Sequence, residues 1–148
     1  MTADMTPAIT CIFAAVAALV NMWLGIRCGQ VRSSAKIGHG DGGNVLLQRR
    51  MRAQLNFAEN TPLVVILFLG LELCGLIPDL VLAIIAAVYI FARIAHGIGM
   101  DAETGSKARM AGVLLTMLVT LALVGMALWC GYTMLDDVEV PASMGSPA

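Results

Sequence analysis

Three polar residues in the stretch RRMRAQLNFAENTP, residues 49–62, recur with the spacing of one helix face. Arg52, Asn56 and Glu59 stand at positions i, i+4 and i+7, which places them within an arc of roughly 60° on an α-helix. A guanidinium and an amide can pair with the carboxylates of a small zwitterion, while the carboxylate pairs with its amine. The spacing therefore predicts a binding surface for an anionic or zwitterionic ligand.

A second polar group follows in the stretch YIFARIAHGIG, residues 89–99. Arg93 and His96 are one helical turn apart there, and Arg109 stands at the start of the next apolar run. Together with Glu59 they bring several cations and a carboxylate to one membrane depth, which favours a wet, protein-lined cleft because lipid exposure of such groups is costly. Two structural interpretations stay open. Glu59 paired with an arginine can lock helices together without a ligand, and a single histidine near a helix end can belong to ordinary packing.

The elements that position these residues are membrane-spanning helices. The 148 residues are 59% hydrophobic and 13% charged, with a mean hydropathy of +0.84, which excludes an ordinary soluble domain. Four apolar stretches meet or approach the about 20 residues that cross a bilayer as a helix. No stretch shows the polar stripe that a half-exposed helix of a soluble bundle requires. We therefore predict an all-α integral membrane protein, a four-transmembrane-helix bundle.

The predicted bundle forms one domain over residues 1–135, followed by a polar tail at residues 136–148. The second connection is short, because the segment from Gly75 to Pro78 turns the second span directly into the third. The first connection is long and glycine-rich, and we expect it to run from about Cys28 to Asn44. The predicted spans cover about residues 8–28, 52–77, 79–99 and 109–134.

The basic residues predict the orientation of the bundle. All nine Lys and Arg residues flank the first and third connections of the predicted topology. The positive-inside rule places those connections in the cytoplasm and both termini outside, in the periplasm or a lumen. Four of the nine are interpreted as snorkelling and topology residues outside the site: Arg27, Arg49, Arg50 and Lys107.

The polar pattern resembles that of a known family of membrane proteins. The pattern R-x-x-x-N-x-x-E-x-x-P, which contains Gln54 and ends at Pro62, is similar to the second-helix signature of the MAPEG family, the membrane-associated proteins of eicosanoid and glutathione metabolism. The stretch GQVR at residues 29–32 is similar to the end of the first helix in the prostaglandin synthase branch. Residues 89–99 resemble the third helix, and Arg109 stands at the spacing of the family's catalytic arginine.

The resemblance implies a homotrimer that binds glutathione between neighbouring subunits, on the cytoplasmic side. By this resemblance Arg109 faces the glutathione sulfur, and Lys107 takes that role if the preceding loop packs differently. Asn60 and Met100 depart from the family pattern, because they stand where members carry tyrosines, and both changes weaken hydrogen bonding near glutathione. The residues that the resemblance assigns to the tripeptide are Arg32, Arg52, Gln54, Asn56, Glu59, Arg93 and His96.

The activity that this resemblance implies is that of a membrane-bound glutathione transferase, with peroxidase activity as a further possibility. A thiol of pKa about 8.5 is mostly protonated at neutral pH, and a preference of about 2.7 kcal/mol for the anion lowers that pKa by about two units. An arginine suits this role because it keeps its charge. The thiolate would attack an apolar electrophile, or reduce a lipid hydroperoxide, arriving from the bilayer. This chemistry requires no metal, and the net charge of −1 does not suggest a nucleic-acid partner.

Two other classes of function stay open. A non-enzymatic scaffold that binds lipid or a partner, of the kind the same family contains, is compatible with Asn60 and Met100. A small proton-coupled exporter would titrate Glu59, but it needs that carboxylate near the bilayer midplane. The predicted span instead places Glu59 only about a turn inside its helix. Glutathione binding by the purified protein separates these classes.

Overall fold

The fold was obtained as a computed structural model, which describes residues 6–136. All four helices are long and apolar enough to cross a membrane. The prediction of an all-α, four-transmembrane-helix bundle is confirmed, and the described part of the chain contains no strand. The helices are α1 (Ala8–Ala35), α2 (Val45–Cys74), α3 (Asp79–Gly99) and α4 (Lys107–Asp136).

The first helix is longer than the predicted span. α1 continues past residue 28 to Ala35, about two more turns. It closes where Lys36 adopts a left-handed conformation with φ 54°, and the backbone N–H of Ile37 donates to the carbonyl of Arg32 at 2.9 Å. The expected start of the connection at Cys28 is therefore wrong. The apolar run ends there, but the following polar segment contains no proline and continues the helical hydrogen bonds.

The second helix begins earlier than predicted and ends earlier. α2 starts at Val45 rather than at residue 52, because the side chain of Asn44 caps it by accepting from the N–H of Leu47 at 2.9 Å. It ends at Cys74, where Gly75 takes the left-handed conformation with φ 70°. The short turn into α3 agrees with the prediction. α3 covers the predicted residues 79–99, and α4 begins two residues before the predicted 109.

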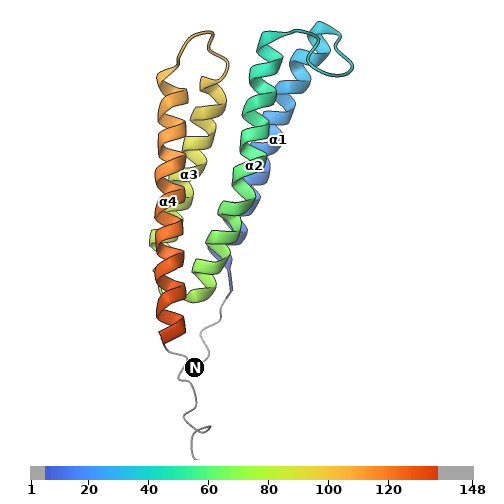
Figure 1. The fold of residues 1–148 in the computed structure, drawn as a ribbon. Helices are drawn as coiled ribbons and strands as arrows, with labels where there is room; N and C mark the ends of the chain where they lie inside the picture. The colour runs from blue at the N-terminus through green and yellow to red at the C-terminus, as the bar shows by residue number, and fades with distance from the viewer. Residues whose placement is uncertain (1–5, 137–148) are drawn as a thin grey trace, which may run out of the picture.

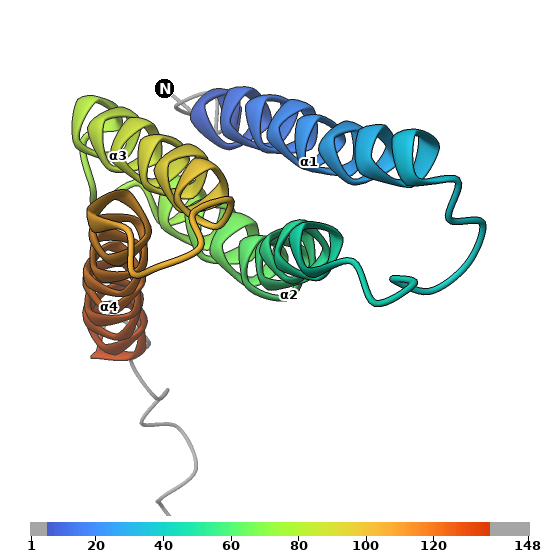
Figure 2. The ribbon, with the colours of Figure 1, turned by 90° about the horizontal axis from the view of Figure 1, so that it is seen from above.

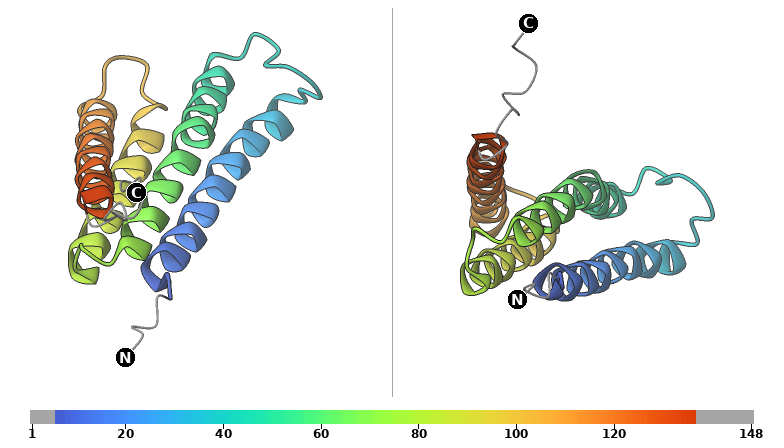
Figure 3. Two further views of the ribbon diagram at one scale, coloured as in Figure 1. Left: turned by 60° about the horizontal axis from the view of Figure 1, so that its bottom comes forward. Right: turned by 90° about the horizontal axis from the view of Figure 1, so that it is seen from below.

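The four helices form two hairpins that spread apart toward one end of the bundle. Figure 1 shows α1 with α2 and α3 with α4, close together near the N terminus and separated where the first and third connections lie. We call this the loop end, with connections 36–44 and 100–106, and the opposite end, with the 75–78 turn, the turn end. Seen from above, α4 lies beside α3 and away from α1 (Figure 2), and the view from below agrees (Figure 3). Toward this end, Arg52 and Leu55 of α2 are exposed in the single chain.

Packing at the turn end is apolar and dense. The ring of Phe13 lies 4.5 Å from that of Phe68 and 5.6 Å from that of Tyr89, and all three side chains are buried. One acidic residue joins α2 to α1 there. The carboxylate of Glu72 accepts the N–H of Ile9 and the N–H of Thr10, each at 2.7 Å. These N–H groups lack partners inside α1. Glu72 therefore supplies the hydrogen-bond acceptors that the first turn of α1 needs within the membrane.

Two glycines bring α3 and α4 into backbone contact near the loop end. A Cβ atom on Gly112 would lie 2.6 Å from the backbone nitrogen of His96 and 2.7 Å from the carbonyl oxygen of Ala92. A Cβ atom on Gly99 would collide with the backbone of Arg109. Only glycine fits so close an approach. The last turn of α3 consequently fixes where the first turn of α4 begins.

Candidate functional site

The predicted ligand residues of α2 lie on different sides of that helix. Arg52, Asn56 and Glu59 share one face, as their spacing requires, and Gln54 points to the opposite side, toward α1. Arg52 and Glu59 are exposed in the single chain, whereas Asn56 is half-buried. The polar face is therefore accessible, and one side of it borders α3.

Arg93 of α3 is joined to this face. Its Nη2 donates to Oδ1 of Asn56 at 2.8 Å, and its guanidinium carbon lies 5.5 Å from the centre of the Phe57 ring. Arg93 is only 2% exposed, yet its Nε has no hydrogen-bond partner among residues 6–136. A buried cation with an unused donor is costly unless another group pairs with it. A ligand role for Arg93 stays a prediction, because this donor is enclosed within the single chain.

His96 stands one turn after Arg93 on α3 and packs against Gly112 of α4. It is buried at the close approach of Gly112, and its Nδ1 has no hydrogen-bond partner among the described residues. A ligand role for His96 stays a prediction.

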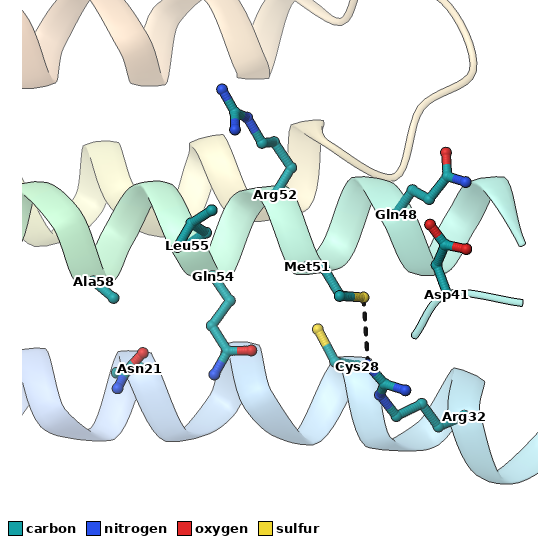
Figure 4. Close-up of a pocket in the computed structure, with 10 residues that line it drawn as sticks. All are labelled: Asn21, Cys28, Arg32, Asp41, Gln48, Met51, Arg52, Gln54, Leu55 and Ala58. Atoms are coloured by element: carbon teal, nitrogen blue, oxygen red, sulfur yellow. Dashed lines mark hydrogen bonds between the residues drawn. The ribbon is translucent and has the colours of Figure 1, made fainter. Parts of the chain in front are cut away.

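Three of the predicted residues line a cavity of about 610 Å³ between α1 and α2. They are Arg32, Arg52 and Gln54. Figure 4 shows Gln54 directed toward α1, while Arg52 extends away from it at the rim. Arg32 is held by its loop, since its Nη1 donates to the carbonyl of Gly40 at 2.6 Å and its Nη2 to the sulfur of Met51 at 3.4 Å. The cavity thus combines a fixed guanidinium with an amide at the loop end.

Arg109 lies apart from this cavity. It is exposed near the start of α4 and, with Ser106 and Met110, lines a separate hollow of about 350 Å³. Lys107 is exposed two residues earlier, in the same turn of α4. In the single chain the predicted set is consequently divided between the α1–α2 cavity, the open face of α2 with Arg93, the α3–α4 contact and the start of α4.

An ion cluster at the loop end was not predicted. Arg27 is 8% exposed, and its Nη2 lies 2.6 Å from Oδ2 of Asp101, while the Nη2 of Arg50 lies 2.9 Å from the same oxygen. Interpreting Arg27 and Arg50 as topology residues only is therefore wrong. Burial alone would raise the pKa of Asp101, but hydrogen bonds and charge from Arg50 and Arg27 outweigh it and lower that pKa. The available signal was an aspartate two residues after the third span, although its position in the sequence does not show which helix it contacts.

Glu72 is the other residue that sequence reasoning missed. An acidic residue inside an apolar stretch is a signal in itself, because it must find a partner within the membrane. Its partner is the backbone of α1, as described above, and sequence spacing gives no indication of a contact between residues so distant in the chain.

Four membrane-crossing helices with polar and cationic residues gathered at the loop end define an integral membrane protein. The sequence model of the MAPEG family matches residues 10–129, and the chain belongs to this family. Family members typically use glutathione, and the family includes glutathione transferases as well as members without enzymatic activity. A search of curated proteins finds no match.

Proposed function

We propose that the protein is a membrane-bound glutathione transferase that activates the glutathione thiolate against apolar electrophiles, and that it also reduces lipid hydroperoxides. The observation that carries this proposal is the open polar face of α2. Arg52 and Glu59 are exposed there beside the buried Arg93, which is hydrogen-bonded to the half-buried Asn56. Glutathione carries two carboxylates and one amine, so its charges complement arginines and a glutamate on one surface.

The depth of Glu59 supports a shared site. Because α2 begins at Val45, Glu59 stands at the middle of the helix, and the expected position about a turn from its start is wrong. Counting about 20 residues back from Cys74 places the hydrocarbon boundary near residue 55. Glu59 therefore lies about one turn inside the hydrocarbon, short of the midplane that an exporter would need. An exposed carboxylate at that depth requires cover by protein, and we propose a second copy of the chain in a homotrimer.

The division of the ligand residues fits such an interface. One chain would present the α1–α2 cavity with Arg32 and Gln54, and its neighbour would present Arg52, Asn56 and Glu59. Each chain offers both surfaces, so a ring of three copies would form three equal sites. In this arrangement neither half binds the whole tripeptide alone.

A second hollow beside the α1–α2 cavity offers a route by which an apolar substrate would enter. A smaller hollow of about 220 Å³ shares Asn21 and Ala58 with it and is otherwise lined largely by apolar residues such as Phe57 and Val65. This hollow lies toward the bilayer centre, so an apolar molecule could approach the thiol from the membrane. A cavity with a polar upper part and an apolar lower part suits the joining of glutathione to an apolar partner.

The proposed reaction uses the guanidinium of Arg109 to stabilise the thiolate. In conjugation the sulfur forms a bond to an electrophilic carbon, and the leaving group departs with its electron pair. With a hydroperoxide the thiolate attacks the terminal oxygen, the alcohol leaves after taking up a proton, and a second glutathione reduces the sulfenic acid to glutathione disulfide and water. The guanidinium stays protonated throughout, which suits it to charge stabilisation rather than proton transfer.

A scaffold without turnover is the second candidate, and two residues favour it. The side chain of Asn60 donates to the carbonyl of Asn56 at 2.8 Å, within its own helix. Met100 is 6% exposed and packs with the buried cluster that contains Leu24 and Phe57. Neither position offers the hydroxyl that family members supply from tyrosines. Isothermal titration of the purified protein with glutathione, followed by ultraviolet absorbance of the bound thiolate, tests the proposal: binding with thiolate supports an enzyme, and binding of lipid alone supports the scaffold.

We also propose that the loop end faces the cytoplasm. All nine Lys and Arg residues lie toward this end of the described helices, and short basic connections are retained on the cytoplasmic side. A reporter fused after Ala148 should be active only if it functions in the periplasm or a lumen. Cytoplasmic fluorescence from such a fusion contradicts this orientation.

A further inference from the structure

Asp101 joins three separate elements at the loop end. It stands two residues after the end of α3, in the connection to α4. Its carboxylate binds Arg27 of α1 at 2.6 Å and accepts two hydrogen bonds from Arg50 of α2, from Nε at 3.1 Å and from Nη2 at 2.9 Å. Its backbone carbonyl also accepts from Nη1 of Arg49 at 3.0 Å. One aspartate therefore holds the end of α3 against both helices of the other hairpin.

Arg27 and Arg50 also donate hydrogen bonds to backbone carbonyls of the neighbouring helices. The Nη1 of Arg27 donates to the carbonyl of Gly97 at 2.8 Å, and the Nη1 of Arg50 donates to the carbonyl of Arg27 at 2.8 Å. The guanidinium of Arg27 also lies 4.6 Å from the centre of the Trp23 ring. These contacts span the region where Figure 1 shows the two hairpins spreading apart. The cluster is thus a cross-link between hairpins that otherwise diverge.

The last turn of α3 passes this constraint to α4. A Cβ atom on Gly97 would lie 2.9 Å from the side chain of Leu24, so α1 touches this turn on one side. Gly99 lies against the backbone of Arg109 on the other side. Moving the end of α3 away from α1 would therefore move Arg109 with it, since close-packed contacts transmit displacement.

We propose that Asp101 is a positioning residue for Arg109, holding the end of α3 so that the guanidinium of Arg109 reaches the thiol of the bound ligand. This inference rests on the proposed function, because it takes a glutathione thiolate as the target of Arg109. Asp101 stands two residues after Gly99, which lies against the backbone of Arg109, so Asp101 acts through the backbone. A residue that served only to hold the fold together would change stability and leave the ionisation of bound glutathione unchanged.

The test measures the ionisation of bound glutathione separately from its affinity. In Asp101→Asn we expect binding within about threefold of the wild type, with the thiolate absorbance midpoint raised by about one pH unit, or roughly tenfold less thiolate near neutral pH. Turnover should fall in parallel and recover as the pH is raised. Asp101→Glu, which keeps the charge, should show a smaller shift of the midpoint than Asp101→Asn. Asp79→Asn, at the other end of α3, is the matched control and should leave the midpoint unchanged.

A second variant keeps the inference testable if Asp101→Asn does not fold. Arg50→Gln removes one of the two cations that bind the carboxylate and leaves Arg27 in place, so a smaller shift in the same direction is expected. The fluorescence of Trp23 in a Trp129→Phe background reports the state of the cluster without any ligand. An unchanged midpoint in a folded Asp101→Asn variant overturns the inference and leaves the proposed function standing. If both variants lose their helices, Asp101 serves the fold alone. If the wild type binds no glutathione as thiolate, the proposed function fails and this inference fails with it.

Discussion

Two glutamates of the same helix show how the ends of the bundle differ. Glu72, at the turn end, accepts two backbone N–H groups of α1 at 2.7 Å, so both carboxylate oxygens are occupied. Glu59, at the middle of α2 and nearer the loop end than Glu72, is exposed on the open face of the helix. A polar group whose hydrogen bonds are satisfied within the chain holds structure, whereas one left open within the membrane needs a ligand or a partner. Glu72 therefore stabilises the turn end, and the proposed binding surface lies at the loop end.

The largest effect should come from the loop end, in Arg109→Ala. Removing the guanidinium should leave glutathione bound, because Arg52, Glu59 and their neighbours hold the rest of the tripeptide. The thiolate fraction near neutral pH should fall about a hundredfold, which corresponds to an interaction of roughly 2.7 kcal/mol. Ultraviolet absorbance of the bound thiolate and turnover both measure this loss, and raising the pH should restore part of the rate.

Lys107→Ala is the control for this prediction. Lys107 is exposed at the start of α4, in the same turn as Arg109. If the thiolate signal survives Arg109→Ala and disappears in Lys107→Ala, the role belongs to Lys107. If neither change matters, the catalytic proposal is wrong and the scaffold becomes the better account.

The turn end should respond in stability instead. Glu72→Gln keeps the size of the side chain, but its amide turns a donor toward one of the two N–H groups of α1. Losing one charge-assisted hydrogen bond costs on the order of 2 kcal/mol. We expect a lower midpoint of unfolding in detergent, measured by circular dichroism, with the glutathione affinity of the remaining folded protein unchanged. Equal stability of variant and wild type would contradict a structural role for Glu72.

Glu59→Gln is the matched change at the loop end and should give the opposite result. The carboxylate is proposed to bind the amine of glutathione, and losing such a bond lowers affinity by about tenfold or more. Unfolding should be unchanged, because Glu59 is exposed in the single chain. Titration calorimetry measures the affinity. Unchanged binding would assign Glu59 to structure, and aggregation of the variant would favour a buried ion pair between helices.

The sequence predicted the helices well and their ends less well. Apolar runs identify the spans because a bilayer requires about 20 apolar residues, but α1 and α2 continue into polar segments that no apolar count detects. Helix ends follow capping instead, as Asn44 and Gly75 show at the two ends of α2. An asparagine followed by a proline-free segment was the usable signal at the start of α2.

The site was predictable only where its residues share one helix. The i, i+4, i+7 spacing of α2 fixes which of its side chains lie on one face, whatever the helix packs against. The pairing of Arg93 with Asn56 depends on how two helices cross, and the position of Asp101 depends on how α3 ends. Such contacts join residues far apart in the chain, so spacing in a single sequence does not determine them.

The smallest expected effect is a loss of folding stability in acid, when Asp101 in the cluster with Arg27 and Arg50 becomes protonated. The pKa of Asp101 is lowered in the folded protein, where Arg50 and Arg27 outweigh the effect of burial. A carboxylate with a lowered pKa contributes stability that is fully present above its unfolded pKa of about 3.9 and is lost as the pH falls through the folded value. Stability should therefore be insensitive to this group from neutral pH down to about pH 4. Below that, the wild type should lose its advantage over Asp101→Asn, whose side chain does not titrate.

The measurement is thermal unfolding of both proteins in detergent across this range, followed by the fluorescence of Trp23, which lies beneath Arg27. The two unfolding temperatures should differ at neutral pH and converge only in acid. Convergence already near pH 6 would mean that the cluster does not lower the pKa of Asp101. A difference that does not shrink at all as the pH falls below about 4 would mean that the stabilisation comes from packing around position 101 rather than from its charge. Either result would weaken the assignment of the cluster as an electrostatic link between the two hairpins.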